Sequence, residues 1–217
     1  MSDYAARRKI MVDTQVRPSD VTKFPIIDAM LSVPRELFVP PAVKESAYIG
    51  EHCQLVSGRY LLEPRTFAKM LDALDVKSDE LVLDVGAGLG YSAAVIARMS
   101  EAVVALEEQS ELAADAEGLL SEVGADSVLV HCGDLVAGMP EHGPYDVVII
   151  QGGVEQVPDA LLAQVKDGGR IAAIFIDNAL GDLQIGYKID GRLHWRSSFN
   201  ATAPILPGFE KFVEFTL

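Results

Sequence analysis

The sequence contains few of the residues on which metal, disulfide or nucleic-acid chemistry depends. Its 217 residues include two cysteines, four histidines and one tryptophan. Lys and Arg number 18 against 32 Asp and Glu, a formal net charge of -14, so the surface would repel the phosphates of nucleic acids and anionic lipids. No run of about 18 apolar residues is present, so no membrane span is predicted. We therefore expect a soluble cytoplasmic protein that binds neither nucleic acid nor membrane.

The two cysteines, Cys53 and Cys132, each follow a histidine, a pattern that raises the question of a metal site. His131 and Cys132 close an apolar strand, in which successive side chains point to opposite faces, so the pair is poorly placed to bind one ion. His142 and His194 show no ligand spacing. We expect no metal site and no hydrolytic triad, and we interpret the cysteines as ordinary thiols.

From residue 81 onward, apolar strands alternate with helical segments. The segments 147–150 and 171–176 are apolar on both faces, as central parallel strands covered by helices must be. The expected elements are strand 81–85, helix 90–99, strand 102–107, helix 110–123, strand 127–132, strand 145–150, helix 158–165 and strand 170–176. This alternation predicts an α/β fold with a doubly wound, mostly parallel sheet and helices on both faces.

The two ends of the chain differ from this pattern. Residues 185–189 and 193–199 flank Asp190-Gly191, which predicts a β-hairpin with a primed turn, and the alternation in 211–217 predicts a last strand. Helices are expected at 5–16, 23–33 and 64–74. Because no Ser/Gly linker precedes residue 81, we expect one domain, in which residues 1–80 form a cap on the substrate side of a core at 81–217.

The most informative segment runs from Val82 to Tyr91: a strand, an acid and three alternating glycines, Gly86, Gly88 and Gly90, leading into a helix. Glycines let the backbone approach a ligand closely, and the helix start offers free N–H groups. Asp84 would repel a pyrophosphate and attract a cationic amino group. The third glycine also comes one residue too early for the dinucleotide fingerprint, with Tyr91 where Gly or Ala is expected. The segment favours S-adenosylmethionine over NAD, with a plain tight turn as the alternative.

Further candidate cofactor residues follow the next strands. Glu107 ends the second strand, where its carboxylate could accept hydrogen bonds from ribose hydroxyls, or could instead cap the following helix. Asp134 could accept from an adenine amino group while Leu135 packs on the ring, or Asp134 could form an Asx-turn. Gln151 and the glycines after it would lie over the crevice, with room for the methionine end and the incoming nucleophile.

With these residues in place, the chain resembles the protein-L-isoaspartate O-methyltransferases. The most specific match lies in the cap, where Ala29-Met30-Leu31-Ser32-Val33-Pro34-Arg35-Glu36-Leu37-Phe38-Val39-Pro40 is similar to that family's Ala-Met-x-x-Val-Pro-Arg-x-x-Phe-Val-Pro segment. The resemblance implies the Rossmann-like class I methyltransferase fold, with seven strands and an antiparallel last pair. It also implies S-adenosyl-L-methionine as cofactor and protein repair by esterification of isoaspartyl carboxylates.

The chain departs from the family pattern on the acceptor side. The family usually has Gly-Gln-Thr-Ile-Ser-Gln-Pro, where this chain has Gly58-Arg59-Tyr60-Leu61-Leu62-Glu63-Pro64. Leu62 therefore stands in place of a serine at the methyl-transfer site, and a leucine cannot donate a hydrogen bond to a carboxylate. Arg59, Tyr60 and Gln151 are the candidate acceptor-side residues, and Arg59 or Arg65 could replace the lost donors.

Three hypotheses follow. The first is an active methyltransferase whose substrate is a protein or peptide that carries isoaspartate. The second is a divergent relative that methylates another, unidentified acceptor, with Leu62, Tyr60 and Gln151 shaping a less polar pocket. The third is a non-catalytic binding module, and a dinucleotide oxidoreductase is a more distant alternative. An isoaspartyl carboxylate is ionised at neutral pH, so the first hypothesis requires no general base.

Overall fold

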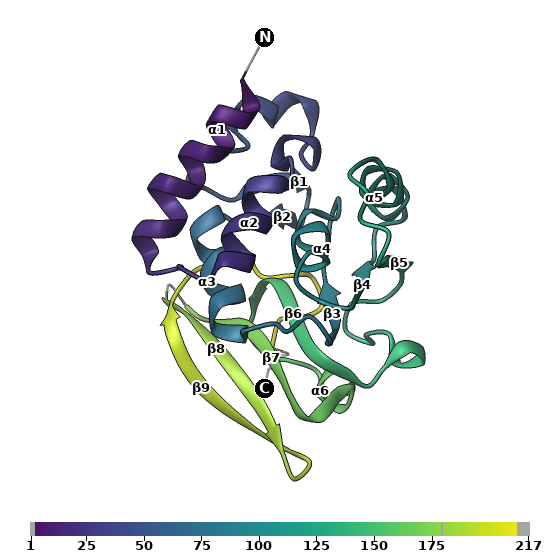
Figure 1. Cartoon of the computed structure of the whole chain (residues 1–217). Coiled ribbons are helices and arrows are strands. Elements are labelled where there is room, and N and C mark those ends of the chain that lie inside the picture. The colour runs from purple at the N-terminus through teal and green to yellow at the C-terminus, as the bar shows by residue number, and fades with distance from the viewer. Residues whose placement is uncertain (1–2, 179, 212–217) are drawn as a thin grey trace, which may run out of the picture.

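The computed structural model describes residues 3–178 and 180–211, which form a central sheet covered on both faces (Figure 1). The sheet has seven strands in the order β5-β4-β3-β6-β7-β8-β9. Its strands are β3 (Leu81–Val85), β4 (Ala102–Glu107), β5 (Val128–Cys132), β6 (Tyr145–Val154), β7 (Val165–Asp177), β8 (Leu180–Ile189) and β9 (Arg192–Asn200). Pairs from β5 to β7 are parallel, and β8 is antiparallel to both of its neighbours. The predicted fold class is confirmed.

Helices divide between the two faces of the sheet because alternate strand residues point to opposite sides. Val82, Val103 and Val147 join one apolar cluster with the cap, and Leu83, Val104 and Val148 join a second cluster on the other face. The first cluster packs α1 (Tyr4–Met11), α2 (Phe24–Ser32), α3 (Pro64–Leu74), α4 (Tyr91–Ile96) and α5 (Ser110–Glu122). The second cluster packs α6 (Asp159–Ala163) and the segment after β9.

Several element boundaries differ from the prediction. The helix expected at 90–99 ends at Ile96, and β6 continues through Val154, so that Gln151 lies in the strand instead of after it. The register of β6 against β7 slips between Ile149 and Gly153, which lets the strand pass its glycines and pair again. The expected last strand, 211–217, lies almost wholly outside the described residues.

The predicted hairpin at β8 and β9 is confirmed. Its turn residues Asp190 and Gly191 have φ of 51° and 74°, as a primed turn between twisted strands requires. A second hairpin was not predicted. It pairs β1 (Cys53–Val56) with β2 (Arg59–Leu61) as a separate two-stranded sheet within the cap. It contains part of the segment 58–64 that was compared with the family motif, and its Arg59 reaches Glu107 of the central sheet.

Among the described residues, no helix combines the length and the apolar character needed to cross a membrane. Cys53 is buried and Cys132 is exposed, and both are free thiols. Within residues 3–178 and 180–211, no three His, Cys, Asp or Glu side chains gather as metal ligands.

Candidate functional site

The glycine turn after β3 is buried. Gly86, Gly88 and Gly90 have φ of 78°, 58° and 94°, a backbone region that favours glycine. A Cβ on Gly86 would lie 3.3 Å from Leu206 Cδ1, and one on Gly88 would lie 2.5 Å from Leu55 Cδ1. The turn therefore has the conformation that the sequence predicted, while side chains of the protein itself lie against its backbone.

Asp84, at the end of β3, is a fully buried carboxylate with neutral partners. Ser92 Oγ donates to its Oδ2 at 2.6 Å, and Gln151 Nε2 donates to its Oδ1 at 2.6 Å. Burial raises the pKa of Asp84 from 3.8 to about 6, the charge of Glu107 also raises it, and the two hydrogen bonds lower it. A group with these properties would be stabilised by a ligand cation. Ser92 was missed by the sequence analysis, since its only signal is its place one residue into the helix after the glycines.

Glu107, at the end of β4, is also fully buried, but its partners differ. Its Oε1 accepts from Arg59 Nε at 2.9 Å and from the backbone N–H groups of Glu108 and Gln109 at 2.9 and 3.0 Å. Its Oε2 accepts from the N–H of Gly88 at 2.9 Å. Glu107 thus satisfies backbone groups just before α5, as the alternative interpretation proposed, and binds a buried cation as well.

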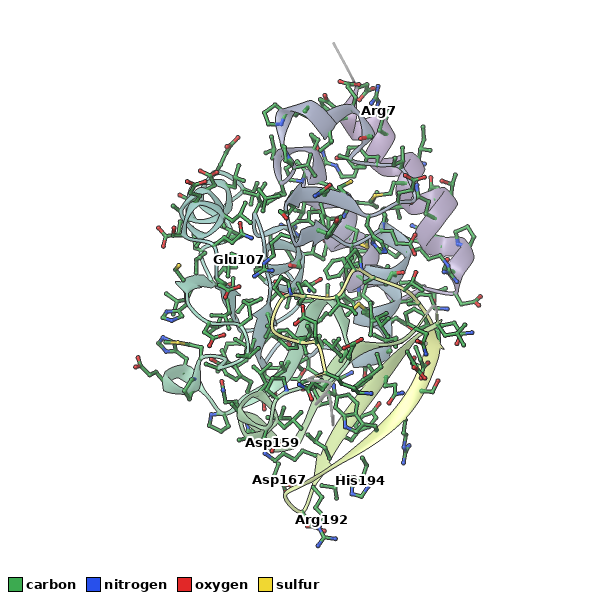
Figure 2. All side chains as sticks on the ribbon, turned by 180° about the vertical axis from the view of Figure 1, so that it is seen from behind. Arg7, Glu107, Asp159, Asp167, Arg192 and His194 are labelled. Carbon is green, nitrogen blue, oxygen red and sulfur yellow. The ribbon has the colours of Figure 1, made fainter. Side chains whose placement is uncertain are left out.

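Arg59 is the clearest correction to the acceptor-side hypothesis. It was a candidate donor to a substrate carboxylate, but its side chain is 1% exposed and lies between Glu107 and Glu108 (Figure 2 labels Glu107). Nη2 donates to Glu108 Oε2 at 2.9 Å, and Nη1 donates to the carbonyl of Gly58 at 3.0 Å. Its guanidinium is committed to these partners and does not face an acceptor cavity.

Asp134 forms the Asx-turn that was the alternative to binding an adenine. Asp134 is exposed, and its Oδ1 accepts from the N–H of Val136 at 3.0 Å, an Asx-turn. Leu135 is buried, with Cδ1 at 3.7 Å from the Cβ position of Gly86. The strand ends therefore bring Asp84 and Glu107 together in the interior, while the Asp134 carboxylate sits at the same edge but in contact with solvent.

Tyr91, a candidate cofactor residue by its place in the glycine turn, has its side chain on the cap side of the helix. Its ring packs against Phe38 and Phe67 with centroids 5.9 Å apart in each pair, and the guanidinium of Arg35 lies 5.0 Å from its centroid. It thus faces the cap, because α4 turns this position toward the first apolar cluster. Gln151 lies beside Asp84, to which its Nε2 donates a hydrogen bond.

On the acceptor side, Leu62 is 1% exposed and packs in the cap core, and its carbonyl accepts from Arg35 Nη2 at 2.8 Å. Tyr60 is half-buried and pairs with Gln54 in the hairpin. A cavity of about 510 Å³ lies beside this motif. Glu63 and the exposed Arg65 line it from the cap, and Asp177, Asp182 and Asn200 line it from the sheet. Arg65, and not Arg59, is the arginine of this segment that faces open space.

Comparisons with known proteins agree with this architecture. Residues 7–196 match the model of the family described as protein-L-isoaspartate(D-aspartate) O-methyltransferase. The chain belongs to this family. A relative from Pelobacter propionicus, protein-L-isoaspartate O-methyltransferase 2, is 36% identical over 179 residues, 80% of each chain. One from Methylorubrum extorquens is 38% identical over 169 residues, 78% of this chain and 74% of the relative.

Solved structures have the same fold. A protein-L-isoaspartate O-methyltransferase superposes with a TM-score of 0.78 at 25% identity, over 94% of this chain and 66% of that one. A structure from Plasmodium falciparum, titled as a putative member of the family in complex with S-adenosyl-L-homocysteine, has a TM-score of 0.78 at 17% identity and covers 95% of this chain and 99% of its own. The family resemblance predicted from the cap motif is confirmed.

Proposed function

We propose that this chain is an S-adenosylmethionine-dependent O-methyltransferase that esterifies the carboxylate of isoaspartyl residues in proteins. The observation that carries the proposal is the pair of buried carboxylates at the ends of β3 and β4, held around a left-handed glycine turn in a chain of this family. Names of relatives and the titled complex with S-adenosyl-L-homocysteine support the same cofactor and acceptor.

The side chains fit the chemistry of the cofactor. Asp84 would face its cationic end, Glu107 its ribose hydroxyls, and Asp134 with Leu135 its adenine. When bound, S-adenosylmethionine would supply a methyl group that passes from its sulfonium sulfur to the acceptor oxygen by in-line displacement, with the neutral thioether S-adenosylhomocysteine as the leaving group. In this structure Leu206 and Leu55 lie against the glycine turn, and Arg59 is bound to Glu107.

The chain's own task in such a reaction is to align, to orient and to exclude water. Ser92 and Gln151 fix the Asp84 carboxylate from two sides. An isoaspartyl carboxylate is already ionised at neutral pH, so it needs no base. Arg65, at the cavity beside the family motif, is the cation placed to bind it, and bidentate binding of carboxylates is a property of arginine.

Leu62 supports a second candidate acceptor. The buried leucine stands where the family motif has its serine, and it packs among apolar side chains. A leucine here lacks the hydroxyl donor of the family motif, which favours an acceptor other than an isoaspartyl carboxylate.

One experiment distinguishes the two candidate acceptors. The protein is incubated with labelled S-adenosylmethionine and either an isoaspartyl peptide or the same peptide with normal aspartate. We expect base-labile methyl ester on the isoaspartyl peptide alone, and a higher KM for Arg65→Gln with kcat little changed. Cofactor binding without ester on either peptide, but with transfer to a panel of small acceptors, would favour the second candidate.

We place the activity in the cytoplasm and on protein or peptide substrates, not on nucleic acid. The charge of -14 disfavours polyanions, and the two free thiols suit a reducing compartment. Cell fractionation with an antibody to the chain, and a filter-binding assay with RNA, test these two points.

A further inference from the structure

Two elements from distant parts of the chain meet over the glycine turn. One is the hairpin of β1 and β2. The other, here called the closing segment, comprises residues 201–209, which follow β9 and lie beyond the residues that match the family model. Figure 2 shows this yellow segment running back across the sheet from the end of β9.

The closing segment is joined to the end of β6 by backbone hydrogen bonds. The N–H of Gly153 donates to Pro204 at 2.8 Å, and the N–H of Leu206 donates back to Gly153 at 2.9 Å. Further along, the N–H of Glu155 donates to Phe209 at 2.9 Å. The segment therefore has a defined position at the carboxyl edge of the sheet, where ligands of open α/β folds bind.

This path puts Leu206 into the predicted cofactor crevice. Leu206 is 2% exposed. Its Cδ1 lies 3.3 Å from the Cβ position of Gly86, and its Cγ lies 2.5 Å from that of Gly152. Both glycines were expected to leave room for a ligand, and at both the room is taken by this one side chain.

Arg59 covers the other side of the predicted cofactor crevice, at the end of β4. Its Nε donates a hydrogen bond to Oε1 of Glu107, whose carboxylate was expected to bind a ribose. Both members of the pair are about 1% exposed, so no solvent reaches the carboxylate. Leu55, from the same hairpin, covers Gly88.

The two sides are in contact with each other. A Cβ on Gly58, in the hairpin turn, would lie 3.0 Å from Pro207 Cγ. His52 Nε2 donates to the carbonyl of Thr202 at 2.9 Å, while its Nδ1 accepts from the N–H of Glu63 at 3.0 Å. The ring therefore connects the closing segment to the acceptor motif, and displacement of one side disturbs the other.

We infer that Arg59 and Leu206 hold the cofactor crevice closed, as an autoinhibitory contact that must open before S-adenosylmethionine binds. The inference rests on the proposed function. A protein whose binding-competent state is a minor one binds with an affinity reduced by that fraction. Removing either side of the closure raises the open fraction and with it the apparent affinity.

The test is calorimetric titration with S-adenosyl-L-homocysteine of the full chain and two variants. Arg59→Gln restores the residue of the family motif and frees Glu107, and Leu206→Ala clears Gly86 and Gly152. We expect each variant to bind about tenfold more tightly than the unmodified chain, and the double variant to bind more tightly still.

Matched controls remove similar groups elsewhere. Arg170→Gln breaks the part-buried ion pair of Arg170 with Glu80, and Leu161→Ala truncates a fully buried leucine of the second apolar cluster. Both should leave the affinity for S-adenosyl-L-homocysteine unchanged. If these controls tighten binding as much as the closure variants do, the effect is general loosening and the inference is wrong.

Equal affinity of the unmodified chain, Arg59→Gln and Leu206→Ala would overturn the closure and leave the proposed function standing. No binding by any of them, the double variant included, would overturn both. Hydrogen exchange of the unmodified chain gives a second readout that needs no variant. Excess S-adenosyl-L-homocysteine should speed exchange at the N–H groups of Gly153 and Leu206, and slower exchange there would contradict the closure.

Discussion

The two buried carboxylates differ in what their surroundings offer a ligand. Asp84 is held by Ser92 and Gln151, which are neutral donors, and its pKa is raised to about 6 by burial. Glu107 is held by the guanidinium of Arg59 and by backbone N–H groups. A ligand cation could therefore stabilise the ionised carboxylate of Asp84, whereas Glu107 already has the guanidinium of Arg59 as its partner. The two residues differ in this way although they end neighbouring strands of the same sheet.

The largest expected effect comes from removing Glu107. Glu107→Leu leaves the Arg59 guanidinium buried with only Glu108 as a charged partner, which should cost about 3–5 kcal/mol of stability. Urea denaturation at neutral pH measures it. As a control, Lys9→Ala breaks an ion pair whose side chains are 73% and 40% exposed, and should have little effect on stability. A similar small loss for Glu107→Leu would mean that the buried pair is not desolvated.

Asp84→Asn should stabilise the protein at neutral pH, where Glu107→Leu destabilises it. The folded state raises the pKa of Asp84 from 3.8 to about 6, so the carboxyl contributes most stability below pH 4 and loses it as pH rises through 6. At pH 7.5 the variant should be more stable by about 3 kcal/mol, and at pH 4 the gain should vanish. Urea midpoints at the two pH values check this, and a destabilised variant at pH 7.5 would contradict it.

A smaller loss of stability is expected from removing a neutral donor to Asp84. Ser92→Ala removes one of the two side-chain donors to Asp84 and should cost about 2 kcal/mol at pH 7.5, since a hydrogen bond to an ionised group is lost. In the Asp84→Asn background the same change should cost less than half as much. Equal costs in both backgrounds would show that Ser92 acts through packing and not through the carboxylate.

The sequence was a good guide to the sheet and to the acids at its edge. Strands β3 and β4 are five and six residues long and mostly apolar, and an acid at or near the end of such a strand lies at the carboxyl edge of a parallel sheet. The positions of Asp84 and Glu107 follow from these local patterns. The primed turn at Asp190 and Gly191 is likewise a local signal.

The closure could not be predicted in the same way. The hairpin strands are only four and three residues long, too short to show a clear period, and Arg59 meets Glu107 across 48 positions of sequence. The closing segment has no regular pattern, because it is fixed by backbone bonds to β6 and not by a period of its own. The packing of the Tyr91 ring against Phe38 and Phe67 was not predictable either, since a helix start does not reveal which face the ring takes.

The central claim is that Asp84 is the carboxylate reserved for a ligand cation, and a pH titration of its ¹³C-labelled carboxyl by NMR tests it most directly. The account predicts a transition near pH 6 in the free protein, which moves to lower pH when S-adenosyl-L-homocysteine brings its ammonium group beside the carboxylate. A transition below pH 4 in the free protein, or one that the ligand leaves in place, would contradict it.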